Sequence, residues 1–218
     1  MKASDIITEV ASQLNDDNNV TWPIALLLGY ITTAEEAIVT IRPDTFSTIS
    51  TMKLAVGTKQ NIPAGSLRLL DIKRNMGTDG ATPGRVVNTV ESASVDLFAY
   101  GHHSDAGATE ITDYSYDERT PDYFYCDPPS DGTGWIEVSI SRSPPVVTTE
   151  GQTLSLKDIY RNAIIQWCMF RAYSIEVDSV SSQRRAAKHE ESFYGLMGKK
   201  FKRDAQYSGS AEVQQNDG

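Results

Sequence analysis

Cysteine is nearly absent from this sequence, and so are the hydrophobic segments that membrane and secreted proteins carry. The two cysteines, Cys126 and Cys168, are too few for a disulfide framework and too far apart for a CxxC metal pair. Because free cysteine prefers protein interiors, we expect both thiols to be buried. No uninterrupted apolar run approaches the roughly 18 residues that span a bilayer, and the first residues lack a signal-peptide hydrophobic region. These absences predict a soluble protein made in a cytoplasm, without a membrane partner.

Positive charge is also scarce. The 218 residues contain 20 Lys and Arg against 29 Asp and Glu, which gives a formal net charge of −9. Proteins that bind duplex DNA on their own obtain affinity by neutralising phosphates with Lys and Arg, so this balance argues against such a role. The same balance is compatible with another role, in which the protein forms a wall along which DNA passes without adhering.

Motifs of catalysis and of cofactor binding are missing. The sequence has no GxSxG elbow, no HExxH and no GxxxxGK[ST] loop. Residues 195–200, GLMGKK, resemble a phosphate loop only superficially, because too few residues separate the glycines and no Ser or Thr follows the lysine. His102 and His103 lie in a glycine-rich loop without further ligands at a metal-binding spacing. We therefore expect no enzyme, no cofactor and no metal site.

The two ends of the chain have helical periodicity. Apolar residues recur at steps of three and four over residues 3–14 and 23–41, with Thr21 expected to cap the second helix. Two apolar stripes run along residues 156–177, which predicts a helix of about 33 Å covered on two sides, at the centre of a bundle. A last helix is expected from residue 180 to about Phe201.

The middle of the chain, residues 45–149, is typical of β structure. Glycines and prolines separate short β-prone runs, and Val95–Tyr100 is expected to form a single helical turn. The turn signal at residues 131–134 predicts that the two flanking strands pair as a hairpin. The expected strands are residues 52–56, 67–72, 85–90, 111–116, 123–126 and 135–141.

These patterns predict an α+β fold, in which N-terminal and C-terminal helices form a helical bundle and the middle is an inserted antiparallel β-rich region. The expected parts are residues 1–44 and 151–203 for the bundle, 45–150 for the insert and 204–218 for a flexible polar tail.

Charge is unevenly distributed along the chain. Acidic residues gather between Asp105 and Asp131, as a solvent-facing strip or as the lining of a passage that repels a polyanion. The last helix has the opposite bias, and its basic residues form either a solvated face or a surface that docks on an acidic partner. These basic residues are Arg184, Arg185, Lys188, Lys199, Lys200, Lys202 and Arg203.

The order of motifs resembles the head-to-tail adaptor (connector) proteins of tailed bacteriophages, of the type that binds beneath the portal. The resemblance covers residues 1–203 and is most specific between Arg42 and Asn75. It depends on WPI at 22–24, IRPD at 41–44, LAVGTKQNIP at 54–63, LLDIKRNMG at 69–77, DYFY at 122–125, GWIEV at 134–138 and LKDIY at 156–160.

The resemblance implies a structural virion protein in the neck between head and tail, synthesised in the host cytoplasm. Such adaptors assemble with themselves as a ring, usually a dodecamer, between the portal protein and a tail nozzle or tail-tube protein. DNA passes through the ring without specific binding. The implied portal-docking residues are the seven basic residues of the last helix, and Asp113, Asp117 and Asp122 are candidates for facing the channel.

Two alternatives stay open at this point. One is another neck or tail part, such as a tail-completion or tail-tube protein, but a tail-tube protein should be rich in strands from end to end. The other is a hydrolase with an acid pair between Asp105 and Asp131, which would need two of these carboxyl groups to converge in a shaped pocket.

Overall fold

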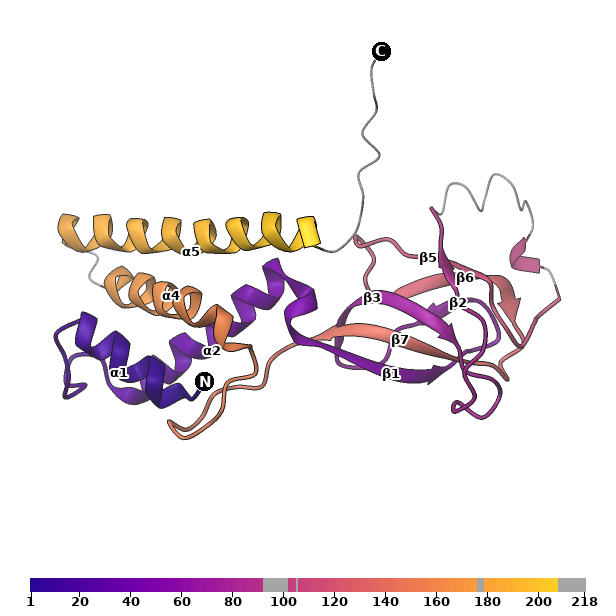
Figure 1. Cartoon of the computed structure of the whole chain (residues 1–218), viewed down its shortest axis with the longest axis horizontal. Coiled ribbons are helices and arrows are strands. Elements are labelled where there is room, and N and C mark those ends of the chain that lie inside the picture. The colour runs from indigo at the N-terminus through magenta and orange to yellow at the C-terminus, as the bar shows by residue number, and fades with distance from the viewer. Residues whose placement is uncertain (92–101, 105, 176–178, 208–218) are drawn as a thin grey trace, which may run out of the picture. The chain divides into compact units, whose positions relative to one another are not determined.

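The computed structural model describes residues 1–91, 102–104, 106–175 and 179–207, with the side chains of residues 102 and 199–207 left out. The chain divides into two compact units, one made of Met1–Ile41 with Pro144–Gly218 and one made of Arg42–Ser143. The four α-helices of the described residues belong to the first, which we call the helical unit, and the seven strands belong to the second, the strand unit (Figure 1). The fold is therefore α+β, as the sequence predicts.

The helical unit contains α1 (Ala3–Gln13), α2 (Ile24–Ile41), α4 (Arg161–Ser174) and α5 (Val180–Tyr207). Helix α4 contacts the other three, so the prediction that the helix with two apolar stripes is central is confirmed. It is shorter than expected, because a 3-10 turn at Asp158–Tyr160 precedes it and it begins only at Arg161. Its 14 residues span about 21 Å at 1.5 Å per residue.

Helix α2 is the most apolar helix of this unit. Among the described residues it is the one helix long and apolar enough to cross a membrane by length and composition, and half of it is buried inside the protein. The core helix of a soluble protein meets the same criteria. Leu27, Ile31 and Ile38 are buried on the side that faces the other helices.

Two polar side chains of α2 hold the chain where it returns from the strand unit. The hydroxyl of Thr32 accepts a hydrogen bond from the N–H of Val147 at 3.0 Å, and one turn later a carboxylate oxygen of Glu35 accepts one from the N–H of Leu156 at 2.9 Å. The N–H of Leu154 donates to the carbonyl of Met1 at 3.0 Å. These bonds fix the course of the segment that leads to α4.

The turn before α2 is organised by a residue that the sequence analysis did not single out. The carboxylate of Asp16 accepts hydrogen bonds from the backbone N–H groups of Val20, Thr21 and Trp22, at 2.8–2.9 Å. Thr21 was expected to cap the helix, but its backbone N–H donates here, and its side chain forms no hydrogen bond with the described residues. The three bonds lower the pKa of Asp16, because they stabilise the carboxylate.

Helix α5 continues beyond the expected end at Phe201 and reaches Tyr207. The prediction that the flexible tail starts at residue 204 is therefore wrong for residues 204–207. The rest of the expected tail, residues 208–218, lies outside the described residues, as does the expected helical turn at Val95–Tyr100.

The strand unit consists of two sheets with the strand orders β1-β7-β3 and β2-β6-β5-β4 (Figure 1). Strand β2 falls in a stretch where no strand was expected, and only two residues of the expected run 85–90 form a strand. The bounds are β1 (Ser47–Lys53), β2 (Gly57–Asn61), β3 (Ser66–Asn75), β4 (Asn88–Thr89), β5 (Asp113–Ser115), β6 (Tyr123–Ser130) and β7 (Trp135–Arg142).

The predicted hairpin between the two strands that flank residues 131–134 is wrong. Strand β6 pairs with β2 and β5, whereas β7 pairs with β1 and β3, so the loop between them carries the chain from one sheet to the other. Gly134 ends this loop, and its carbonyl oxygen accepts a hydrogen bond from the N–H of Leu54 at 2.9 Å. The turn signal correctly located the loop between β6 and β7, but each of these strands pairs with strands from other parts of the sequence.

The core of the strand unit lies between the inner faces of the two sheets. Apolar and polar residues alternate over 135–141 of the sequence, which predicts one buried and one solvent-facing side, and Ile136, Val138 and Ile140 are indeed fully buried. Ser141 was expected on the solvent-facing side but is buried as well. Both cysteines are buried as expected, Cys126 in this core and Cys168 in the helical unit. Burial raises the pKa of Cys126 to about 11 and that of Cys168 still further, so both thiols stay protonated.

Candidate functional site

The basic residues of α5 form the first candidate surface. Arg184, Arg185 and Lys188 are exposed, and in the part of the chain that the structure describes no carboxylate forms an ion pair with them. Three unneutralised cations therefore stand on the first half of α5. The other four predicted docking residues, Lys199, Lys200, Lys202 and Arg203, belong to the last turns of the helix, and their side chains lie outside the described part.

The packing of α5 against α4 is what exposes these cations. Ala186, Phe193 and Met197 are buried at helical spacing, and Phe193 is 0% exposed with its ring centroid 4.9 Å from that of Trp167. Residues on the opposite side of an amphipathic helix must then face outward.

Arg185 is held in place by an aromatic stack. Its guanidinium lies 5.5 Å from the ring centroid of Tyr173, and that ring stacks on His189 at 5.7 Å. A ring nitrogen of His189 is 2.7 Å from the side-chain oxygen of Gln166 on α4. Burial lowers the pKa of His189, and the neighbouring charges of Lys188 and Arg185 lower it further, so this imidazole adds no charge at neutral pH.

A groove between α4 and α5 lies beside these cations and was missed by the sequence analysis. It encloses about 600 Å³. The signal in the sequence is the spacing of positions 188, 191, 192 and 195, which places small and polar residues on one side of a helix. The lining residues are Asn162, Gln166, Lys188, Glu191, Ser192, Gly195 and Leu196.

The predicted channel-facing acids do not form one cluster. Asp113 begins β5 and lies opposite Asp127 of β6, whereas Asp117 and Asp122 belong to the loop that joins these strands at the other end. Asp117 is four residue steps along the chain from Asp113, which amounts to about 13 Å for fully extended chain.

The acids also differ in how far they are neutralised. Asp117 makes a two-pronged ion pair with Arg119, with its closest N–O distance at 2.8 Å, and this pair lowers the pKa of Asp117. Its neighbour Glu118 pairs with Arg68. Asp122 is exposed and forms no ion pair among the described residues. Arg119 and Arg68 thus neutralise part of the negative charge near the middle of the acidic strip.

Asp113 and Asp127 are the one directly opposed acid pair on adjacent strands of the described part of the chain. Neither lines the groove between α4 and α5 or the cavity of about 310 Å³ beside His103. His103 itself is exposed, and a ring nitrogen lies 2.7 Å from the hydroxyl of Thr58. Within the residues that the structure describes, no group of three His, Cys, Asp or Glu could hold a metal ion.

The fold and these surfaces together define a two-unit α+β protein with a charged, outward-facing terminal helix. The model of the family described as SU10 adaptor protein matches residues 1–214, and the chain belongs to this family. No curated protein matches the chain. The resemblance seen in the sequence is confirmed: the protein is a phage adaptor, a structural virion protein of the head-to-tail junction.

Proposed function

We propose that the chain assembles as a ring, usually a dodecamer, beneath the portal protein, and that α5 docks the ring on the portal while the opposite side receives the tail nozzle or tail-tube protein. The observation that carries the docking role is the row of exposed, unpaired cations on α5 in a protein of net charge −9. Opposite potentials steer encounter and fix orientation between partners, so this helix fits an acidic surface.

Passage of DNA through the ring is the second part of the proposal. Asp113, Asp117 and Asp122 face the channel in this scheme, and their charge keeps the passing polyanion from adhering. Because Arg119 neutralises Asp117, the exposed Asp122 contributes more to this repulsion. The helical bundle formed by both chain ends serves as the rigid body that carries the docking helix.

Point substitutions test the docking role better than removal of the whole helix. Truncation after residue 178 would also remove Phe193 and Met197, which are buried against the rest of the helical unit. Reversing Arg184, Arg185 and Lys188 to Glu leaves these residues in place. Particles with this triple variant should lack tails, and the purified variant should not bind the portal.

A matched control changes the net charge equally. Lys2, Lys157 and Arg85 are exposed and lie outside α5, so their reversal to Glu also lowers the net charge by six. This control should leave portal binding nearly intact. Normal tail attachment in the α5 variant, or equal loss in both variants, would show that α5 does not dock on the portal.

The channel role has a separate test. Reversal of Asp113, Asp117 and Asp122 to Lys should slow or stall genome exit in otherwise complete particles, with the largest share of the effect from Asp122. Reversal of the exposed residues Asp17, Glu36 and Glu150 serves as the control with the same change of charge. Unchanged ejection kinetics in the first variant would place these acids outside the channel.

The alternative of a tail-tube protein is disfavoured by the helices, which form a unit of their own at both ends of the chain. Negative-stain images of the purified protein provide the check, since a tube protein forms long tubes by itself and an adaptor does not.

A further inference from the structure

Of the sheet edges formed by β1, β2 and β3, the edge of β1 is the one that nothing in the described residues covers or protects. Sheet edges carry unpaired backbone groups that can pair with another chain, and proteins protect them with bulges, charges, proline or short strands. The edges of β2, β3 and β1 can be compared directly, because each has a defined pairing on its other side.

The edge of β3 is protected twice. Its pairing with β7 shifts register three times, between Ser66 and Arg68, between Leu69 and Asp71, and between Ile72 and Arg74. Such bulges bend and twist a strand away from a flat edge. On its other side, the N–H groups of Leu69 and Ile72 donate to the hydroxyls of Tyr116 and Tyr114, at 3.2 and 3.4 Å.

The edge of β2 is protected by its length and composition. The strand has five residues, carries Lys59 in its middle and is followed at once by Ile62 and Pro63. Each of these features discourages addition of a further strand.

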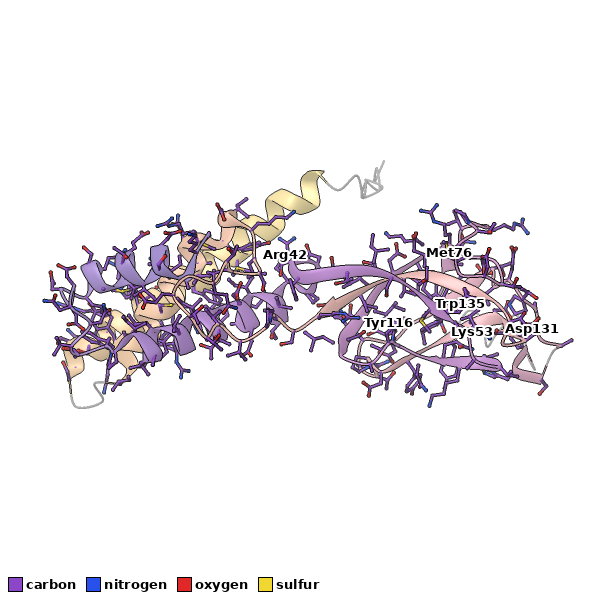
Figure 2. All side chains as sticks on the ribbon, turned by 90° about the horizontal axis from the view of Figure 1, so that it is seen from below. Arg42, Lys53, Met76, Tyr116, Asp131 and Trp135 are labelled. Carbon is purple, nitrogen blue, oxygen red and sulfur yellow. The ribbon has the colours of Figure 1, made fainter. Side chains whose placement is uncertain are left out.

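The edge of β1 has none of these protections. All seven residues pair with β7 without a register shift. The strand reads STISTMK, with no proline and a single charge at its last residue, Lys53. Figure 2 shows Arg42 and Lys53 toward opposite ends of the strand unit, so this edge runs along much of its length.

The backbone groups on the free side of β1 can be assigned. The N–H of Leu54 donates to the carbonyl of Gly134, which continues the pairing of β1 with β7. In an antiparallel pair the bonded residues alternate, so Met52, Ser50 and Thr48 bond to β7. The N–H and C=O groups of the intervening residues point away from the sheet. These residues are Ser47, Ile49, Thr51 and Lys53, none of which has a backbone hydrogen bond on that side within the described residues.

We propose that this edge pairs with β1 of a second copy of the same chain, antiparallel and about a two-fold axis at Ser50. This register places Ser47 opposite Lys53 of the other copy and Ile49 opposite Thr51. All outward-pointing residues then face one another, so every free N–H of one strand meets a free C=O of the other. The two three-stranded sheets become one continuous six-stranded sheet.

The side chains fit the same register. Lys53, the only charge of the strand, meets an uncharged serine, so no like charges are opposed. Ile49, which is 60% exposed in the single chain, packs beside a β-branched threonine. In a chain of net charge −9, this strand without acidic residues is a place where two copies approach without strong repulsion.

The pairing goes beyond the proposed ring. A closed ring joins unlike surfaces of neighbouring subunits, whereas a two-fold pairing joins a surface to itself. In this proposal the free protein is a dimer before it joins the ring. The docking role of α5 does not depend on this dimer. A strand edge buries less area than a stable interface, so we expect dissociation in about the micromolar range.

Cysteine cross-linking tests the register. In the two-fold pairing, position 50 faces itself in a non-bonded pair with about 4.5 Å between Cα atoms, which is within disulfide range. Ser50→Cys should therefore form a covalent dimer on mild oxidation. Thr48→Cys is the matched control, because its two copies would lie about 13 Å apart. The buried Cys126 and Cys168 do not compete.

Sedimentation of the full chain tests the backbone bonds. Thr51→Pro removes an outward N–H that β7 does not use and should weaken self-association about tenfold or more. Thr51→Val keeps the N–H and should associate like the wild type. A wild type that stays monomeric at about 1 mM, or equal cross-linking at positions 48 and 50, would overturn the proposal. If the wild type is monomeric and particles that carry Thr51→Pro lose their tails, the edge of β1 pairs with another protein and not with a second copy.

Discussion

Two glycines of the strand unit differ from the glycines of the helices in the space around them. In the helical unit, a Cβ added to Gly29, Gly195 or Gly198 would meet nothing within 4 Å. In the strand unit, a Cβ on Gly134 would overlap the carbonyl oxygen of Thr109, and one on Gly107 would lie 2.9 Å from the backbone of Asp131. The helical unit is held by side chains that interdigitate, whereas this end of the strand unit requires backbone to touch backbone.

The close approach in the strand unit has a topological cause. The loop at residues 131–134 carries the chain between the sheets and passes beside residues 106–109, where the N–H of Asp131 donates to the carbonyl of Ala108 at 3.0 Å. Trp135 and Asp131 lie toward the same end of the strand unit in Figure 2. Added atoms there have no space, so small changes should have large effects.

The largest effect is expected at Gly134. Gly134→Ala should prevent the strand unit from reaching its native fold, because the new methyl group overlaps backbone that cannot move aside. Denaturation followed by near-ultraviolet circular dichroism should show that the transition of this unit is lost. Gly198→Ala is the control, and a strand unit that unfolds cooperatively in both variants would refute the comparison.

Loss of a large core side chain should follow in size. Phe193→Ala removes a fully buried ring that packs on Trp167, and should lower the free energy of unfolding of the helical unit by about 3–5 kcal/mol. Glu191→Ala, at an exposed residue of the same helix, should change it by less than about 0.5 kcal/mol. Urea unfolding curves of both variants measure this difference, and similar losses would mean that α5 does not pack as described.

Glu35 gives the helical unit a dependence on pH. Burial raises its pKa, and the hydrogen bonds from the N–H groups of Leu156 and Ser155 offset this only in part. One of its carboxyl oxygens is buried without a hydrogen-bond partner in the described structure. A carboxyl in such a site favours its protonated form.

The sign of the effect follows from the raised pKa. The folded state binds the proton more tightly than the unfolded chain, whose Glu titrates near about 4.3, so stability falls as pH rises from there through the folded pKa. Glu35→Gln cannot ionise and should gain stability relative to the wild type between pH 4 and pH 8. Melting temperatures of both proteins across this range measure the gain.

The matched control for this prediction is Glu36→Gln, which makes the same change of charge at an exposed neighbour. Its difference from the wild type should vary little with pH. A Glu35→Gln difference that is constant with pH, or that shrinks as pH rises, would show that Glu35 is ionised without cost in the folded protein.

The smallest effect is expected from the exposed helical glycines. Gly198→Ala should stabilise the helical unit by about 1 kcal/mol, because alanine has the higher helix propensity and its methyl group meets no neighbour. A small rise in melting temperature is the expected readout. A loss of stability would mean that another part of the protein approaches α5 at this position.

Local patterns were enough to find most of the elements. The spacing of apolar residues located α1 and α2 to within one residue at their starts, and the two stripes identified α4 as central. Alternation located β7, although not its partners. The basic bias of α5 was visible as well, but only the packing of Phe193 showed that its first three cations face outward.

Features that depend on distant residues were missed or wrong. Strand β2 reads GTKQN, which has little β propensity, and it forms because β6 lies beside it. The segment before α4 is held by Glu35, which is 121 positions away from Leu156. The three candidate acids looked like one strip, and the pairing of β5 with β6 separated Asp113 from the other two.

The sequence by itself determined the α+β class, the helices of both chain ends and the adaptor family, because periodicity, turn residues and ordered motifs are recorded along the chain. Only the tertiary structure decided which strands pair, which edge stays open and which glycines are indispensable. The physical reason is that pairing and close approach depend on backbone groups, which are the same in nearly every residue and which only the folded chain brings together.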